Sequence, residues 1–320
     1  MLTERSISIV VPCYNEQENI RALHERTVAV MAKVTTDWEL VFVDNGSRDE
    51  SGATFAALAA QDSHVTVLSL SRNFGSQAAY SSGIEYAHGS AVICMDGDLQ
   101  DPPEVIPELV ARWLEGYEVV YGDRVRRKAG FAMQVANKAF YRLLRRFSYI
   151  DIPLDAGDFG LLDRRVVDIM NAMPERNRLI RGLRAWVGFR QVGVPYARDA
   201  RHAGRSSNSL LDLFRWASTG LVSYSYAPLE LISVLAGAVM VLAAIAIVIY
   251  TVLYFINPNV PQGFQTLLVA ILFLGAVQLL CFSIMSEYIA KIFEEVKARP
   301  KYIVRTVTNS AGSSAPRADD

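Results

Sequence analysis

The chain has 320 residues, of which 51% are hydrophobic and 20% are charged, and its formal net charge is −1. This length and composition allow a sizeable buried core, and the near-neutral charge argues against nucleic acid as a partner. Cys13, Cys94 and Cys281 are far apart and have no Cys-x-x-Cys spacing, which is typical of reduced thiols in the cytosol rather than of a disulfide framework.

Apolar runs and helical stretches alternate through the first half of the chain. We predict strands at Ile7–Pro12, Trp38–Asp44, Val65–Ser71, Ala91–Met95 and Glu118–Tyr121. We predict helices at Asn19–Val34, Ser51–Gln61, Ser76–His88 and Glu104–Glu115. The alternation predicts an α/β fold, a doubly wound and mostly parallel sheet with helices on both faces.

Polar residues follow each of the first four predicted strands. They lie at Tyr14–Glu16, Asp44–Ser47, Ser71–Gly75 and Asp96–Asp98. Sheets of this type bind ligands at the carboxyl ends of their strands, so we expect these four groups to meet in one binding site.

The most informative group is the one after the fourth strand. Asp96 and Asp98 are one residue apart, and Gln100, Asp101 and two prolines follow. Ionised carboxylates cannot be buried at a strand end without compensation. Mg²⁺ or Mn²⁺ would provide it, with oxygens from Asp98 and Gln100, Asp96 nearby, and the remaining ligands from water and a diphosphate. The alternative is that the aspartates only cap the helix near Glu104.

The middle of the chain is less regular. We predict a basic helix at Phe131–Ser148, a loop at Gly157–Phe159, a short helix at Ile180–Val187 and a strand at Gln191–Pro195. Near-helical apolar spacing at Ser209–Tyr226 indicates an amphipathic helix on a membrane surface, with a core-packing helix as the alternative.

A long uncharged stretch follows. No Asp, Glu, Lys or Arg occurs from Leu231 to Ser286, which is enough for two membrane spans of about 20 residues each. We predict spans at Leu231–Ile256 and Phe264–Tyr288, separated by a turn that contains Pro258, Pro261 and Gly263.

Cations follow the second span but are missing from the turn. The positive-inside rule then places both termini and the domain before the first span in the cytoplasm, and we see no signal peptide. We expect a catalytic domain at 1–205, a juxtamembrane helix at 206–228, two spans at 229–290, and a cytoplasmic tail at 291–320 that is disordered after about residue 305.

Five motifs in order, together with the hairpin, carry a family resemblance. They are Val11–Glu16, Val43–Ser47, Leu70–Gly75, Met95–Pro103 and Gly157–Phe159. Over roughly residues 6 to 305 the chain resembles the polyisoprenyl-phosphate glycosyltransferases, relatives of dolichol-phosphate mannose synthase among the inverting family 2 glycosyltransferases. It is most similar to bacterial members with two spans that transfer glucose or a related sugar to undecaprenyl phosphate.

The resemblance implies a GT-A fold, a nucleotide-sugar donor similar to UDP-glucose, a polyisoprenyl phosphate acceptor and a divalent metal ion. It also implies roles for single residues. Pro12, Tyr14 and Glu16 would line the nucleotide pocket, Asp44 would contact base or ribose, Asp96, Asp98 and Gln100 would hold diphosphate and metal, Arg124 would bind phosphate, and Asp158 would be the active-site aspartate near the acceptor. Tyr14 as a packed aromatic and Arg124 as a surface cation remain alternatives.

Three departures from the family pattern concern the ligands. Asn45 replaces a second aspartate, Gly160 replaces a frequent arginine, and Gly204–Asn208 lacks the usual lysine and aromatic residue, with Arg205 as the nearest substitute. Two other functions stay open: a processive polysaccharide synthase, although only Asp212–Trp216 is close to its Gln-x-x-Arg-Trp motif, and an inactive membrane scaffold.

Overall fold

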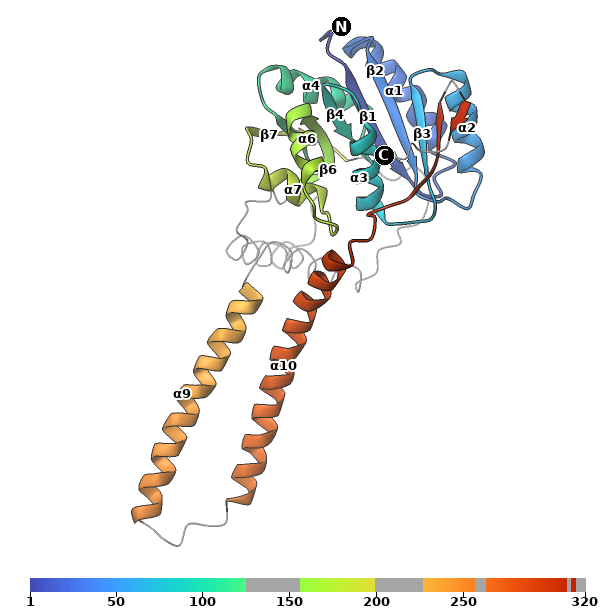
Figure 1. Cartoon of the computed structure of the whole chain (residues 1–320). Coiled ribbons are helices and arrows are strands. Elements are labelled where there is room, and N and C mark those ends of the chain that lie inside the picture. Colours follow the sequence, from blue (N-terminus) through green and yellow to red (C-terminus); the bar gives the residue numbers. More distant parts are fainter. Residues whose placement is uncertain (125–155, 199–226, 257–262, 310–311, 315–320) are drawn as a thin grey trace. The chain divides into compact units, whose positions relative to one another are not determined.

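The computed structural model describes residues 1–124, 156–198, 227–256, 263–309 and 312–314. These residues divide into two units. One unit contains the sheet together with the residues from Ala298 onward. The other contains two long apolar helices, the second of which ends at Lys297 (Figure 1). The predicted features at Phe131–Ser148 and Ser209–Tyr226 lie outside the described residues.

The sheet unit alternates strands and helices. Its strands are β1 Ile7–Cys13, β2 Trp38–Asp44, β3 Val65–Leu70, β4 Ala91–Cys94, β5 Val119–Arg124, β6 Ala156–Asp163, β7 Gln191–Tyr196, β8 Val304–Asn309 and β9 Gly312–Ser314. Its helices are α1 Ile20–Val34, α2 Ser51–Gln61, α3 Ser76–Tyr86, the 3-10 helix η1 Pro103–Val105, α4 Ile106–Leu114, α6 Arg164–Ala172 and α7 Ile180–Trp186. The five strands and four helices predicted in the first half are confirmed, with ends that differ by a few residues.

The described strands form one mixed sheet in the order β7-β5-β6-β4-β1-β2-β3-β8-β9. The pairs β1/β2, β1/β4, β2/β3 and β5/β7 are parallel. Antiparallel pairing extends this core at β6 and β8. The predicted α/β fold class is thereby confirmed, and the parallel centre is the part that brings strand carboxyl ends together.

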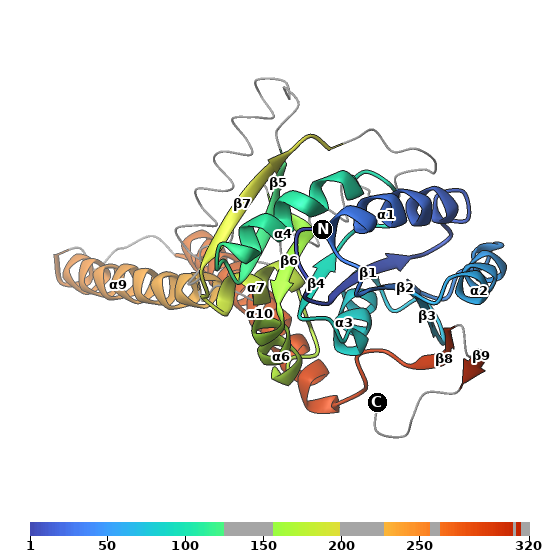
Figure 2. The same cartoon turned by 90° about the horizontal axis from the view of Figure 1, so that it is seen from above.

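Both faces of the central strands are buried. On β1, Ile7, Ile9 and Val11 belong to the core cluster that also contains residues of α1, α2 and α4, whereas Val10 belongs to the cluster on the other face, with residues of α3, α6 and α7. The helices of the two layers are on opposite sides of the sheet in Figure 2. Because strands buried on both faces are apolar throughout, β1 and β2 are recognisable from the sequence without alternation.

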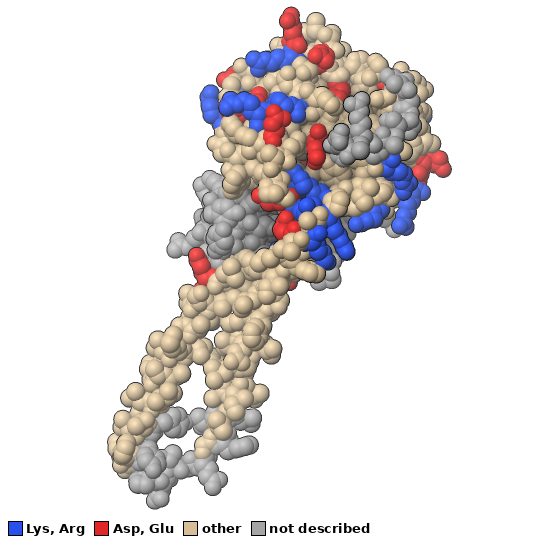
Figure 3. Space-filling model, in the orientation of Figure 1, with Lys and Arg blue, Asp and Glu red and all other residues tan. Residues whose placement is uncertain are grey.

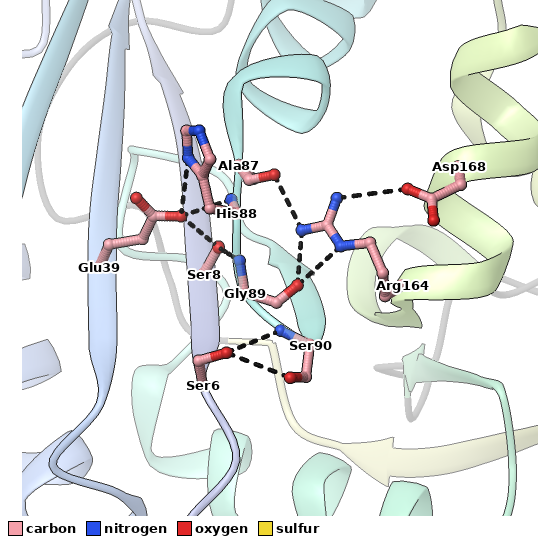
Figure 4. A network of polar contacts seen from close by, with 9 residues as sticks. All are labelled: Ser6, Ser8, Glu39, Ala87, His88, Gly89, Ser90, Arg164 and Asp168. Atoms are coloured by element: carbon pink, nitrogen blue, oxygen red, sulfur yellow. Dashed lines mark hydrogen bonds and ion pairs between the residues drawn. The ribbon is translucent and has the colours of Figure 1, made fainter.

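A polar network joins the amino ends of β1, β2 and β4 (Figure 4). We call it the amino-edge network, and it comprises Ser6, Ser8, Glu39, Ala87, His88, Gly89, Ser90, Arg164 and Asp168. Glu39 Oε1 accepts hydrogen bonds from Ser8 Oγ (2.5 Å) and from His88 N (2.7 Å). Arg164 donates to the carbonyl oxygens of Ala87 and Gly89, each at 2.8 Å.

Two predictions were wrong. Gly157–Phe159 is not a loop but lies in β6, between β4 and β5. The predicted disorder after about residue 305 does not hold for residues 306–309, because β8 pairs with β3 and thus covers the backbone groups of a sheet edge that would otherwise be unpaired.

The second unit contains α9 Ala227–Ile256 and α10 Phe264–Lys297, and the predicted spans lie within them. Most of their large apolar side chains are exposed, including Val234, Ile247 and Phe255. The described surface of this unit in Figure 3 has almost no charged side chain until the last turns of α10. Both helices are long and apolar enough to cross a membrane, and such exposed apolar surface is typical of contact with lipid or a partner.

Candidate active site

The carboxyl ends of β1, β2 and β4 bring the predicted polar groups together. Cys13 at the end of β1 lies opposite Asp44 at the end of β2, and Met95 N donates to Val10 O (3.0 Å). The thiol of Cys13 lies under this edge. Burial raises its pKa, and so do the charges of Glu16, Asp44, Asp96 and Asp98. Four of the predicted site residues are therefore close enough to Cys13 for their charges to act on its pKa.

Asp96, in the loop after β4, has a strongly raised pKa. Burial and the charge of Asp101, with smaller contributions from Asp158 and Asp98, raise its pKa to about 7. Tyr80 Oη donates to Asp96 Oδ1 (2.7 Å), and Arg198 Nη2 lies 3.4 Å from Oδ2. Within the described part of the chain, this edge thus carries more negative charge than its cations compensate.

The loop after Asp96 is tightly built. Asp98 is buried, and its Oδ1 accepts from Gln100 N (3.1 Å). Between them Leu99 has a φ of 59°, a conformation that costs a non-glycine residue energy and is common at functional sites. Pro102 and Val105 are the N-caps of η1 and α4 and form no side-chain cap. The alternative in which these aspartates serve only as helix caps is not supported.

Asp101 lies beneath the site and is fully buried. Its Oδ1 accepts from Tyr196 Oη (2.5 Å) and is 3.4 Å from Arg198 Nε, while Oδ2 is 3.9 Å from Arg124 Nη2. Arg124 Nε in turn donates to Tyr196 Oη (3.1 Å). Burial opposes the charge of Arg124, but Asp101 raises its pKa. Arg124 is therefore part of a network and not an isolated surface cation.

Asp158 faces the same edge from β6. Gln77 Nε2 on α3 donates to Asp158 Oδ2 (2.8 Å), and Gln77 Oε1 accepts from Ile180 N (2.7 Å). Within the described residues Asp158 Oδ1 is buried without a hydrogen-bond partner. The guanidinium of Arg184 is nearby and almost fully buried, so burial lowers its pKa while the charge of Asp158 opposes that shift.

The backbone around Gly160 in β6 leaves no room for the arginine that the family resemblance would place there. Gly160 lies between Cys94 on β4 and Tyr121 on β5. A Cβ atom there would be 2.6 Å from the carbonyl oxygen of Val120 and 2.9 Å from Tyr121 Cα, closer than backbone atoms allow. No side chain fits at this position without a backbone shift.

The predicted nucleotide residues border the other side of the edge. Tyr14 is 39% exposed, which argues against a merely packed aromatic ring. Asp44 Oδ1 accepts from Ser47 N (2.9 Å) and shapes the turn after β2. Asn45 Nδ2 donates to Asn73 Oδ1 (3.3 Å), and Asn45 Oδ1 accepts from Phe74 N (2.9 Å). An aspartate could not donate, so the departure at Asn45 has a structural reason.

A divalent cation fits this edge only as a shared ion. Among the described residues, no group of three or more His, Cys, Asp or Glu side chains is arranged to hold a metal alone. The hard oxygens of Asp98 and Asp96, with Gln100 in the same loop, suit Mg²⁺ or Mn²⁺ if the ligand and water complete the shell. The raised pKa of Asp96 fits the need for such a charge.

Arg198, Tyr196, Tyr80 and Gln77 were not predicted from the sequence. Arg198 and Tyr196 lie at the carboxyl end of β7, so the rule that ligands bind at strand ends, applied to the seventh strand, would have found them. Arg205, the substitute for the missing lysine, lies outside the described residues, as does Asp212–Trp216.

Comparisons with known proteins identify the family of the chain. The model of the family described as glycosyl transferase family 2 matches residues 8–169. The chain is 40% identical to an uncharacterized glycosyltransferase of Synechocystis over 93% of this chain and 94% of the relative. It is 38% identical to the bactoprenol glucosyl transferase of Shigella phage SfII, over 93% and 97%. Among solved structures, it is similar to a mannosyltransferase from Pyrobaculum calidifontis in complex with GDP-Man and Mn²⁺, with a TM-score of 0.46, 16% identity and coverage of 93% and 89%.

Proposed function

The chain belongs to glycosyl transferase family 2, and on this premise we propose that it transfers glucose or a related hexose from a uridine-type nucleotide-sugar to a polyisoprenyl phosphate, undecaprenyl phosphate being the first candidate. Two observations support the proposal. A named bactoprenol glucosyl transferase is similar over nearly the full length of both chains. The chain also has two helices suited to a bilayer, which is where a polyisoprenyl acceptor resides.

The observation that carries the proposal is the charge pattern of the carboxyl edge. Burial and the charges of nearby acids, Asp101 above all, raise the pKa of Asp96 to about 7. Asp96 and Asp101 lie beside the guanidinium groups of Arg198 and Arg124. A reaction between two phosphate-bearing substrates needs both kinds of group: acids that share a cation with one diphosphate, and arginines that bind a second phosphate directly.

On the donor side, Pro12, Tyr14, Glu16 and Asp44 would receive the nucleoside. Asp98, with Gln100 and Asp96, would hold Mg²⁺ or Mn²⁺, which when bound stabilises the negative charge of the departing diphosphate. The protein's own share is to keep these oxygens fixed, and the hydrogen bonds of Asp98 to Gln100 N and of Asp96 to Tyr80 do so.

On the acceptor side, the nucleophile would be an oxygen of the lipid phosphate. A phosphate monoester has a second pKa of about 6, so this oxygen is largely ionised at neutral pH and needs little help from a base. Arg124 and Arg198 would hold the phosphate. Asp158, fixed by Gln77, would orient the acceptor, and attack opposite to the leaving diphosphate would invert the anomeric carbon.

We further propose that the catalytic domain and both termini lie on the cytoplasmic side of the inner or plasma membrane, as the cations after the second span suggest. Small residues in the apolar helices, among them Gly237, Ala243 and Gly275, would allow packing against a second copy, so a homo-oligomer is compatible with this arrangement.

The test is a transfer assay in membranes or detergent with radiolabelled UDP-glucose, GDP-mannose or UDP-GlcNAc, undecaprenyl phosphate, and Mg²⁺, Mn²⁺ or a chelator. We expect one labelled sugar to move into the lipid-extractable fraction, and only with a divalent cation. A long water-soluble polymer would indicate the processive synthase instead, and no consumption of any donor would indicate an inactive scaffold.

A further inference from the structure

The chain returns to the sheet after its second apolar helix. Residues 298–309, which we call the return segment, belong to the same unit as the catalytic sheet. Within it β8 runs antiparallel to β3, with Leu68 opposite Val307 and Leu70 opposite Val304. Val307 is buried in the core on the α3 side of the sheet. The segment is therefore a built part of the domain that contains the site.

The return segment holds Ser71, the first residue after β3, by both of its backbone groups. Ser71 N donates to Ile303 O (2.9 Å), and Arg305 Nη2 donates to Ser71 O (2.7 Å). Tyr302 Oη also donates to Glu85 Oε2 on α3 (2.7 Å). The side chain of Arg305 is exposed, but its hydrogen bond to Ser71 is charge-assisted, which makes it stronger than a neutral bond in the same setting.

Ser71 begins a loop that contacts the turn after β2, where Asp44 lies. The next residue, Arg72, packs so closely on Gly46 that a Cβ atom at Gly46 would be 2.6 Å from its carbonyl carbon, and Gly46 has a φ of 74°. Further along the loop, Asn73 and Phe74 are hydrogen-bonded to Asn45. Asn45 and Gly46 directly follow Asp44. An unbroken series of contacts thus runs from Arg305 to the turn that begins with Asp44.

We propose that Arg305 is a positioning residue for the nucleotide end of the donor. It anchors the Ser71–Gly75 loop against Asn45 and Gly46, and so holds Asp44 in place. The inference rests on the proposed function, because it assumes that Asp44 meets the nucleoside. It also assigns a role to the return segment. After the apolar hairpin, this segment stabilises the loop next to Asp44, which lies far from Arg305 in the sequence.

The experiment measures binding and turnover separately in the full-length protein. The first variant is Arg305→Met, which keeps the aliphatic part of the side chain but removes its N–H groups. The second is Arg305→Lys, which keeps the positive charge and can still form one hydrogen bond to Ser71 O. Arg299→Met is the matched control, since Arg299 contributes a backbone carbonyl as acceptor for Arg176 and this contact does not need its side chain. Each protein is titrated with UDP and GDP in the presence of Mn²⁺, and its thermal unfolding is recorded.

We expect Arg305→Met to weaken nucleotide binding and to raise the KM for the donor about tenfold, while the KM for the lipid phosphate stays within about twofold. Arg305→Lys should recover most of the loss, and Arg299→Met should match the wild type. A lower melting temperature of Arg305→Met with unchanged nucleotide affinity, or an equal rise of both KM values, would overturn the inference. Absence of nucleotide binding in the wild type would instead overturn the proposed function.

Discussion

The two edges of the central sheet are built from similar residues but differ in how well their polar groups are satisfied. In the amino-edge network each charged side chain is matched: Glu39 accepts from Ser8 and His88, and Arg164 donates to two carbonyl oxygens and lies 3.6 Å from Asp168 (Figure 4). At the carboxyl edge, Asp101 Oδ2 and Asp158 Oδ1 are buried without a hydrogen bond among the described residues.

This difference separates residues that stabilise the fold, at the amino edge, from residues that bind ligands, at the carboxyl edge. A polar network whose hydrogen bonds are satisfied contributes to folding, whereas a concentration of like charges costs folding free energy and is retained where a ligand needs it. The amino edge should therefore respond to mutation in melting temperature, and the carboxyl edge in turnover. Each prediction below tests one side of that division.

The largest effect is expected for Asp98→Asn at the carboxyl edge. Loss of the charge that shares the cation with the donor should lower kcat about a thousandfold, comparable to removal of a principal electrostatic stabiliser, with little change in melting temperature. The measurement is single-turnover transfer in a metal-replete assay. Near-normal turnover would contradict the metal assignment, and the amino-edge variant Glu39→Gln, with unchanged kcat, is the control.

The second effect concerns Gly160→Arg, which restores the residue frequent in the family. Because a Cβ at this position meets the backbone of Val120 and Tyr121, we expect about 3 kcal/mol of destabilisation and no gain in activity. Chemical denaturation measures the stability and the transfer assay the activity. A stable and more active variant would show that β6 can move away from β5 and that the carboxyl edge lacks a cation.

A third, smaller effect compares the two edges directly. Arg164→Met removes the hydrogen bonds to the carbonyl oxygens of Ala87 and Gly89 and should cost about 2 kcal/mol of stability without changing the KM for either substrate. Tyr196→Phe keeps the ring but removes the hydroxyl between Arg124 and Asp101, and should cost about tenfold in kcat/KM for the lipid phosphate. If both variants lost stability alone, the division between the edges would fail.

Much of the sheet and of the carboxyl edge could be predicted from the sequence. The buried strands β1 to β4 are short apolar runs, and the residues that follow them meet because parallel strands share a carboxyl edge, so the convergence of Asp44, Asp96 and Asp98 was predictable. β6 was not, since its two glycines break any alternation and its pairing with β4 and β5 is decided by partners far away in the sequence. β8 was missed for the same reason: Val304–Asn309 is polar and becomes a strand only beside β3.

The contacts between charged side chains at the carboxyl edge could not be predicted from the sequence either. Asp101 contacts Arg124, Tyr196 and Arg198, and nothing in the local sequence around any of these residues indicates the others. Gln77 on α3 and Asp158 on β6 are likewise far apart in the sequence and become neighbours only in the folded domain. Strand order determines which side chains of distant segments become neighbours, and single-sequence patterns report strands without their order.

The smallest effect is a difference in pH dependence. The pKa of Asp96 is raised to about 7, so the folded protein holds this proton more tightly than the unfolded chain does. Its contribution to stability is present at low pH and is lost as the pH rises toward 7. Asp62, beside His64 at the start of β3, shows the opposite case: although burial opposes it, hydrogen bonds from His64 and His24 lower its pKa, so its contribution is lost only as the pH falls below the ordinary value of 3.8.

Of Asp96 and Asp62, only Asp96 changes its protonation state between pH 5 and 8. We expect the melting temperature of the cation-free protein to fall with rising pH relative to that of Asp96→Asn, which carries no titrating group at this position. Thermal unfolding of both proteins in a chelating buffer measures the difference, and other titrating groups cancel because both proteins share them. Parallel curves would mean that Asp96 is fully ionised at pH 5, and then the carboxyl edge would not carry the excess negative charge on which its contrast with the amino edge depends.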